Sequence, residues 1–255
     1  MVVDLNFEDK FSIITLNRPN ALNALNSEVI SRLDECFAQL AGSDARCLII
    51  TGTGEKAFCA GADIKELRGN SPIGHKKLLK CGQRVFDKIA DLPMASVAAI
   101  NGYAFGGGLE LALSCTFRIA TPNAKVGLPE IRLGLTPGYG GTQRLPRVVG
   151  EARALEMIMS GRTVDANEAL GIGLVSEVVE GDVVAAAKEF AGAFTGFSLP
   201  VLKLVRSAVM RAGDTPLAGG QDIESDVGAQ AFAMDDAKEG MTAFEEKREA
   251  GFKDA

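Results

Sequence analysis

Hydrophobic residues along this chain fall into two patterns: short continuous runs, and positions three or four residues apart. The continuous runs at residues 11–16, 47–51, 96–100 and 116–120 predict strands that are buried on both faces. The second pattern predicts helices between them, the first of which is capped by Ser27 and ended by Gly42.

Strands that alternate with helices predict an α/β fold with largely parallel pairing. From about Gly150 the pattern becomes helical, apart from one further strand expected within residues 170–179. We therefore divide the chain into an α/β core, residues 1–195, and a helical C-terminal region, residues 196–255.

Composition and charge restrict the class of protein. Of the 255 residues, 47% are hydrophobic and 24% charged, which argues against disorder. The formal charge of −6 and the lack of a basic stripe argue against a nucleic-acid partner. The apolar runs are too short to span a bilayer, so no membrane association is expected. The acids in MVVDLNFEDK are unlike a targeting segment, and we expect a cytoplasmic protein.

Cysteine and histidine are poorly placed for metal or triad chemistry. The five cysteines form no CxxC pair and lie mostly in apolar stretches, so we expect buried, reduced thiols and no metal. The single histidine, His75, lies in the polar stretch GNSPIGHKK, and we interpret it as a surface residue. Any catalysis must then use carboxylates and backbone groups.

The segment NGYAFGGGLELAL, residues 101–113, begins where the strand at 96–100 ends, and its three glycines lead into an apolar helix. A helix N-terminus presents unpaired N–H groups and a partial positive charge, which suits a phosphate or a developing oxyanion. A tight strand-to-helix turn would use the same glycines. Glu110 falls in the first turn among apolar neighbours, a setting that raises a carboxyl pKa toward the range of acid/base catalysis.

Two other segments add candidate groups. Glu130 follows Pro129 between apolar residues and precedes the glycine-rich turn TPGYGG. In KAFCAGADIKEL, the small residues around Gly61 permit close backbone approach, so that Ala62 offers a second N–H. Two such donors directed at one oxygen would form an oxyanion hole.

Four segments, in this order and spacing, resemble the enoyl-CoA hydratase (crotonase) family, in particular its short-chain hydratases: FCAGADIKEL, NGYAFGGGLELAL, PEIRLGLTPGYGGTQRLPR and FEEKREAGFKD. The resemblance covers nearly the whole chain. It implies a spiral of repeated ββα units that carries the active site, followed by a C-terminal helical region for trimerisation. The expected assembly is a homotrimer or a dimer of trimers.

The resemblance also implies roles for individual residues. Glu110 and Glu130 match the two catalytic glutamates of the hydratases, and the backbone N–H groups of Ala62 and Gly107 match the oxyanion hole. The positions implied to contact the acyl-CoA substrate are Ala21, Leu22, Ala60, Asp63, Ile64 and Lys65. The chain departs from the family at Asn20, where many relatives carry Lys or Arg, although Arg18 lies close by.

The implied reaction is the reversible syn-hydration of a 2-trans-enoyl-CoA to a 3-hydroxyacyl-CoA, as in fatty-acid beta-oxidation. It implies no cofactor, because coenzyme A is part of the substrate. A double-bond isomerase of the same superfamily is the alternative, although the presence of both glutamates favours hydration. An RNA-binding family member is a further alternative, which the negative charge disfavours.

Overall fold

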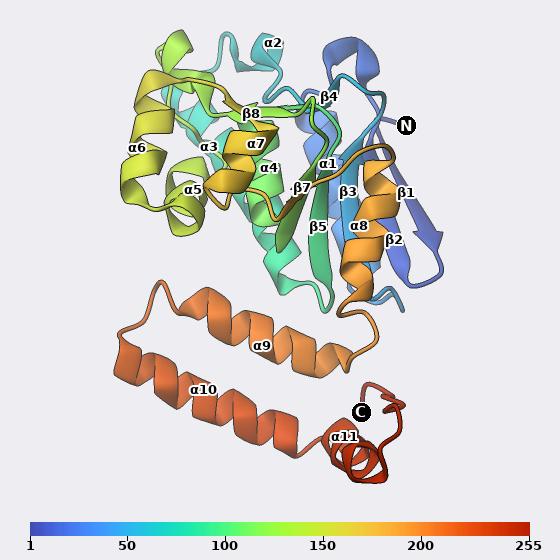
Figure 1. Cartoon of the computed structure of the whole chain (residues 1–255). Coiled ribbons are helices and arrows are strands. Elements are labelled where there is room, and N and C mark those ends of the chain that lie inside the picture. Colours follow the sequence, from blue (N-terminus) through green and yellow to red (C-terminus); the bar gives the residue numbers. More distant parts are fainter.

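Two β-sheets form the centre of the computed structural model, which describes residues 1–255 (Figure 1). The larger sheet has six strands in the order β1-β2-β3-β5-β7-β10. Their bounds are Val3–Glu8 (β1), Phe11–Leu16 (β2), Cys47–Gly52 (β3), Ala95–Ile100 (β5), Phe117–Ala120 (β7) and Glu177–Val178 (β10). β1 pairs antiparallel with β2, and every other pairing in this sheet is parallel.

The smaller sheet has four strands in the order β4-β6-β8-β9. Their bounds are Ala57–Cys59 (β4), Tyr103–Phe105 (β6), Lys125–Gly127 (β8) and Val164–Asp165 (β9). In sequence, β4 follows β3, β6 follows β5, and β8 follows β7, so each passage through the large sheet continues into the small one. A helical segment then leads to the next pair, which gives the repeated ββα unit that the resemblance implied.

Helices cover both faces of the larger sheet. Those of the first 195 residues are α1 (Ser27–Leu40), α2 (Ile64–Leu67), α3 (Pro72–Asp91), α4 (Gly107–Ser114), α5 (Gly141–Val149), α6 (Glu151–Ser160), α7 (Ala166–Gly171) and α8 (Val183–Gly192), with 3₁₀ turns η1 (Pro19–Ala21) and η2 (Pro129–Leu133). The main core of 42 buried residues includes the apolar faces of α1, α3 and α4. A smaller cluster lies on the opposite face, where α8 covers the sheet (Figure 1).

The last three helices lie apart from this core (Figure 1). They are α9 (Leu199–Arg211), α10 (Leu217–Phe232) and α11 (Asp235–Glu246). Arg206 ties α9 to the end of α3 by donating to the carbonyl oxygens of Ala90 and Leu92. Neither α9 nor α10 has a buried residue, so their apolar side chains have little cover within one chain.

Most of the sequence-predicted elements are present, with shifted ends. The first long helix is capped by Asn26, whose side chain accepts from the Val29 N–H, and not by Ser27. The expected strand within 170–179 is reduced to β10, two residues long. The thiols are all free, but Cys81 is exposed, contrary to the expectation of a buried thiol, because it lines an open cavity between α1 and α3. None of the helices combines the length and apolar character needed to cross a bilayer.

Candidate active site

The site begins where β6 ends and α4 starts. Gly106 has φ of +52°, a conformation that glycine adopts readily, and it turns the chain so that α4 begins at Gly107. α4 is in close contact with β4: a Cβ atom on Gly108 would lie only 2.1 Å from the Cys59 carbonyl oxygen, so no side chain fits there. The helix N-terminus therefore lies against the segment that follows β4.

That segment brings a second backbone donor close to the helix. Gly61 has φ of +104°, and a Cβ built on it would lie 2.9 Å from the Phe105 carbonyl oxygen and 3.7 Å from the Gly107 nitrogen. The N–H groups of Ala62 and Gly107 donate to no acceptor within the protein. Both residues line one cavity of about 310 Å³. The structure thus brings together the two backbone groups that the sequence singled out.

Glu110 lies in the first turn of α4, at the wall of the same cavity, and is only 2% exposed. Its Oε1 accepts hydrogen bonds of 2.7 Å from the backbone N–H groups of Tyr139 and Gly141. Burial raises the pKa of this carboxyl above its usual range, and the two N–H donors oppose part of that shift. The carboxyl is therefore fixed in orientation while its proton affinity is increased.

Glu130 lies in η2 and lines the same cavity. A Cβ on Gly106 would lie 3.0 Å from its Oε1, so this carboxyl lies directly over the start of α4. Its Oε2 is buried without a hydrogen-bond partner in the protein. Burial, with the nearby Glu110 carboxyl as a smaller cause, raises the pKa of Glu130 to about 7. Two carboxyl groups with different surroundings thus meet in one cavity.

The six positions expected to contact acyl-CoA lie along the edge of this site, and only Ala60 and Ile64 line the cavity itself. The Ala60 N–H donates to the Leu22 carbonyl oxygen at 3.0 Å, which joins the loop after η1 to the end of β4. Asp63 caps α2, which contains Ile64 and Lys65, and accepts from Arg18 at 3.1 Å. That hydrogen bond with the Arg18 guanidinium lowers the pKa of the Asp63 carboxyl.

The sequence analysis missed several groups of the site. His75 is half-buried and lines the cavity that holds Glu110 and Glu130, whereas the sequence predicted a surface residue. His75 and Leu79 are four residues apart on α3, so they share the face of the helix that lines the cavity. Leu79, Leu133 and Leu135 add an apolar wall. The backbone N–H groups of Tyr139 and Gly141 were also missed, although the glycine-rich turn was a signal of close backbone approach.

Comparison with known proteins agrees with this fold. The model for the family described as enoyl-CoA hydratase/isomerase matches residues 6–255. The chain belongs to the enoyl-CoA hydratase/isomerase family, and it is an enzyme of that family.

Relatives are similar over nearly their whole length. The chain is 42% identical over 254 residues to a short-chain-enoyl-CoA hydratase of Clostridium acetobutylicum, with 98% of this chain and 97% of the relative covered. It is 41% identical over 250 residues to a crotonyl-CoA hydratase of Syntrophomonas wolfei, with 97% and 96% covered. Its structure matches that of the enoyl-CoA hydratase from Bacillus anthracis with a TM-score of 0.95, at 35% identity and with 100% of both chains covered. These similarities confirm the α/β fold predicted from the sequence.

Proposed function

We propose that this enzyme catalyses the reversible addition of water to a 2-trans-enoyl-CoA, with a 3-hydroxyacyl-CoA as the product. The observation that carries the proposal is that the buried carboxyl of Glu110 and the half-buried carboxyl of Glu130 lie beside two unpaired backbone donors in one cavity. Relatives named as hydratases support it further. The direct assay is the loss of conjugated-enoyl absorbance across a panel of enoyl-CoA chain lengths.

In the proposed reaction the N–H groups of Ala62 and Gly107 bind the thioester oxygen. As water adds at C3, negative charge moves onto that oxygen, and donors already in place stabilise it without reorganisation. The partial positive charge at the start of α4 acts in the same direction. Water addition causes no net oxidation or reduction, and the two N–H donors stabilise the charge on the thioester oxygen, so we propose that no metal or redox cofactor takes part. CoA supplies binding energy remote from the reacting carbons.

The two carboxyl groups divide the proton transfers. Glu110, fixed by its two N–H donors, takes a proton from the attacking water, and Glu130 gives a proton to C2. The raised pKa of Glu130 keeps a fraction of it protonated near neutral pH, which a proton donor requires. In the reverse direction, dehydration, the same groups exchange roles.

The double-bond isomerase remains the second candidate, because the matching family includes isomerases. An isomerase moves a proton between C2 and C4 and adds no water. The presence of a second carboxyl group able to hold water beside the first is what favours hydration here.

The pKa of Glu130 gives a prediction for the pH dependence of hydration. Since the protonated form is the proton donor, and its pKa is raised to about 7, kcat/KM for hydration should fall as pH rises through about 7. A pH–rate profile measured with crotonyl-CoA checks this. The alkaline decline should be absent from the residual activity of Glu130→Gln; a variant that keeps the decline would assign it to another group.

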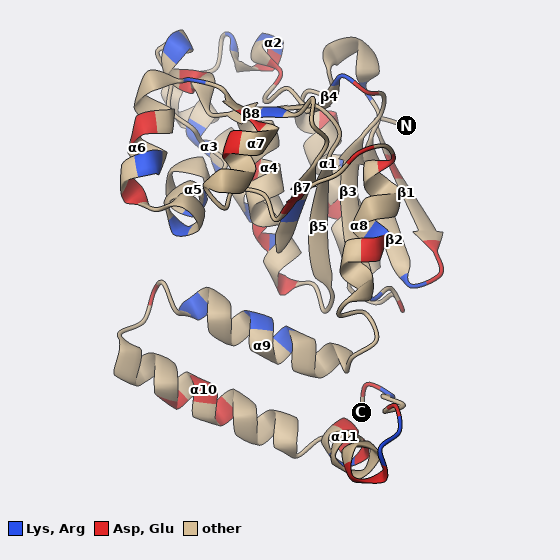
Figure 2. Ribbon diagram, viewed as in Figure 1, with Lys and Arg blue, Asp and Glu red and all other residues tan.

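We further propose that the chain assembles as a homotrimer or a dimer of trimers through α9–α11. These helices expose large apolar side chains, among them Val205, Val209, Met210, Leu217, Phe232 and Phe244. Lys and Arg lie on α9 whereas Asp and Glu gather on α10 (Figure 2), so two copies could also pair opposite charges. Burial of such surface favours association, and stable interfaces of this kind bury over about 2,000 Å².

Light scattering at micromolar concentration should therefore report three or six chains, each of 26.8 kDa. Phe244→Glu places a charge on the most exposed of these aromatic side chains and should shift the population toward single chains. A fully active wild-type enzyme that remains a single chain at this concentration would contradict the proposal.

A further inference from the structure

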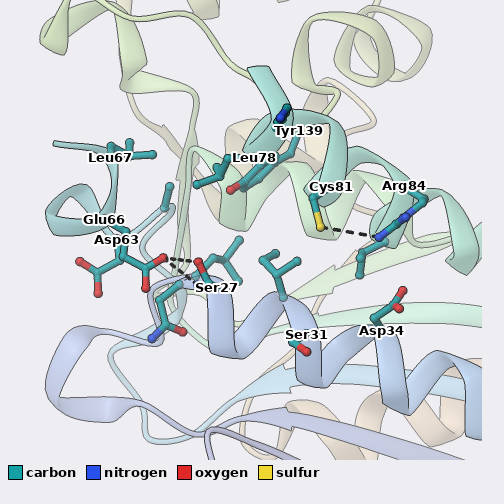
Figure 3. Close-up of a pocket in the computed structure, with 16 residues that line it drawn as sticks. Ser27, Ser31, Asp34, Asp63, Glu66, Leu67, Leu78, Cys81, Arg84 and Tyr139 are labelled. Carbon is teal, nitrogen blue, oxygen red and sulfur yellow. Dashed lines mark hydrogen bonds between the residues drawn. The ribbon is translucent and has the colours of Figure 1, made fainter. Parts of the chain in front are cut away.

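A second cavity, of about 410 Å³, lies next to the catalytic one. Side chains from α1, α2 and α3 surround it, and Figure 3 shows Ser27, Ser31 and Asp34 of α1 facing Leu78 and Cys81 of α3 across it. Three residues line both cavities: Ala62, Leu67 and Tyr139. These residues form the wall that the two cavities share.

The position of the proposed thioester site connects this wall with the substrate. If the Ala62 N–H binds the thioester oxygen, the thioester lies beside the shared wall. The proposed coenzyme A contacts Ala21, Leu22 and Ala60 do not line the second cavity. Of the six proposed contacts only Asp63 lines it, at the α2 end. Most of the proposed path of coenzyme A therefore lies outside the cavity, and the acyl chain is the part of the substrate that could reach its interior.

Tyr139 is held tightly in the shared wall. Its ring packs edge-on against Phe86, with ring centroids 5.5 Å apart. A Cβ on Gly82 would lie 2.4 Å from the ring, and one on Gly107 would lie 3.2 Å from it. The ring thus occupies the space between α3 and α4, and Figure 3 shows its hydroxyl end beside Leu78, directed into the second cavity.

The inner lining of the second cavity suits an alkyl chain. Leu25, Ile30 and Val85 are each at least nine-tenths buried and line it, together with Leu78. Polar groups line its two ends: Ser27, Asp63 and Glu66 at the α2 end, and Asp34 and Arg84 farther along α1 and α3 (Figure 3). Methylene groups that entered past the shared wall would meet the apolar residues and leave water, which is favourable at about 0.8 kcal/mol for each buried CH₂.

From these contacts we propose that Tyr139 sets the acyl chain length by separating the two cavities. The second cavity is a latent extension of the acyl site: the wild-type ring confines the enzyme to short chains, and removal of the ring admits long ones. This inference rests on the proposed binding of acyl-CoA at Ala62. Tyr139 would then have two roles: its backbone N–H donates to Glu110, and its side chain limits the length of the acyl chain.

The test compares the binding of two saturated thioesters, butyryl-CoA and dodecanoyl-CoA, by titration calorimetry. Wild type should bind dodecanoyl-CoA no more tightly than butyryl-CoA. Tyr139→Ala should change the ratio of the two dissociation constants in favour of dodecanoyl-CoA by at least about tenfold, and Tyr139→Phe, which keeps the ring, should preserve the wild-type ratio. Tyr139→Leu serves as a second variant that leaves a smaller void, since large-to-small core changes destabilise.

A double variant locates the bound chain. Ser31 is exposed on α1 and lines only the second cavity, so Ser31→Trp should fill that cavity and cancel the gain of Tyr139→Ala. A gain that survives Ser31→Trp would place the chain elsewhere and overturn the proposal. So would a wild-type preference for dodecanoyl-CoA, or an unchanged ratio in both Tyr139→Ala and Tyr139→Leu. Saturated thioesters cannot be hydrated, so this result stands apart from a failure of the proposed hydratase activity, which the enoyl-CoA assay reports.

Discussion

Replacing either glutamate of the cavity with glutamine should slow the hydration of crotonyl-CoA by about 10²–10⁴-fold, because a general acid or base contributes that much. Glutamine keeps the size of the side chain, and at position 110 its amide oxygen can still accept from the N–H groups of Tyr139 and Gly141. The fold and the affinity for butyryl-CoA should therefore be retained. Steady-state kinetics and calorimetric titration measure the two effects separately.

Glu55→Gln is the matched control, since Glu55 is exposed in the loop between β3 and β4 and lies outside the catalytic cavity. It makes the same chemical change and should leave turnover unaltered. Near-normal turnover in Glu110→Gln or Glu130→Gln would remove that residue from the mechanism. A loss of butyryl-CoA binding as large as the loss of rate would assign it to binding.

A single methyl group at Gly108 should impair both stability and catalysis. Its Cβ would meet the Cys59 carbonyl oxygen at 2.1 Å, so Gly108→Ala must push α4 away from β4. Overpacking of this kind costs about 1–3 kcal/mol of stability. The shift also moves the Gly107 N–H, and the loss of one oxyanion donor lowers kcat by about 10²–10³-fold. Thermal unfolding and kcat for crotonyl-CoA are the measurements.

Gly192→Ala provides the control for this variant. Gly192 ends α8, far from the site in sequence, and a Cβ there would meet no atom within 4 Å. The added methyl group should leave kcat unchanged. If Gly108→Ala were as stable and as active as Gly192→Ala, the close packing of α4 on β4 would not determine the position of the Gly107 N–H.

The parts of the fold that the sequence predicted well are those with a long apolar pattern. β3 is buried at all of its positions and was predicted to within one residue of its true end. α3 was predicted from the helical spacing of its apolar residues between Leu78 and Leu92, but its polar first turn, which begins at Pro72, was not. The strands of the small sheet were missed because β4, β6 and β8 have only three residues each, too few for a period to show. β1 was missed as well; half of its residues are exposed at the edge of the sheet.

Only those features of the candidate site that depend on neighbouring residues in the sequence could be predicted. Glycines before an apolar helix mark the start of α4, and this placed Glu110 in a first turn. Its hydrogen bonds come from Tyr139 and Gly141, 29 and 31 residues later in the chain, and no local pattern reports such contacts. His75 illustrates the same limit, since its polar neighbours are exposed while its own side chain lines the cavity.

The central claim is that the enzyme adds water to a conjugated enoyl thioester bound in the cavity of Glu110 and Glu130. The most direct measurement is mass spectrometry of the products formed from crotonyl-CoA in heavy-oxygen water. The account predicts 3-hydroxybutyryl-CoA that carries one heavy oxygen atom on C3, formed by wild type and strongly reduced in Glu110→Gln and Glu130→Gln. If wild type instead formed no labelled product from crotonyl-CoA while it rapidly converted a 3-enoyl-CoA to the 2-enoyl form, the hydratase proposal would be contradicted in favour of the isomerase.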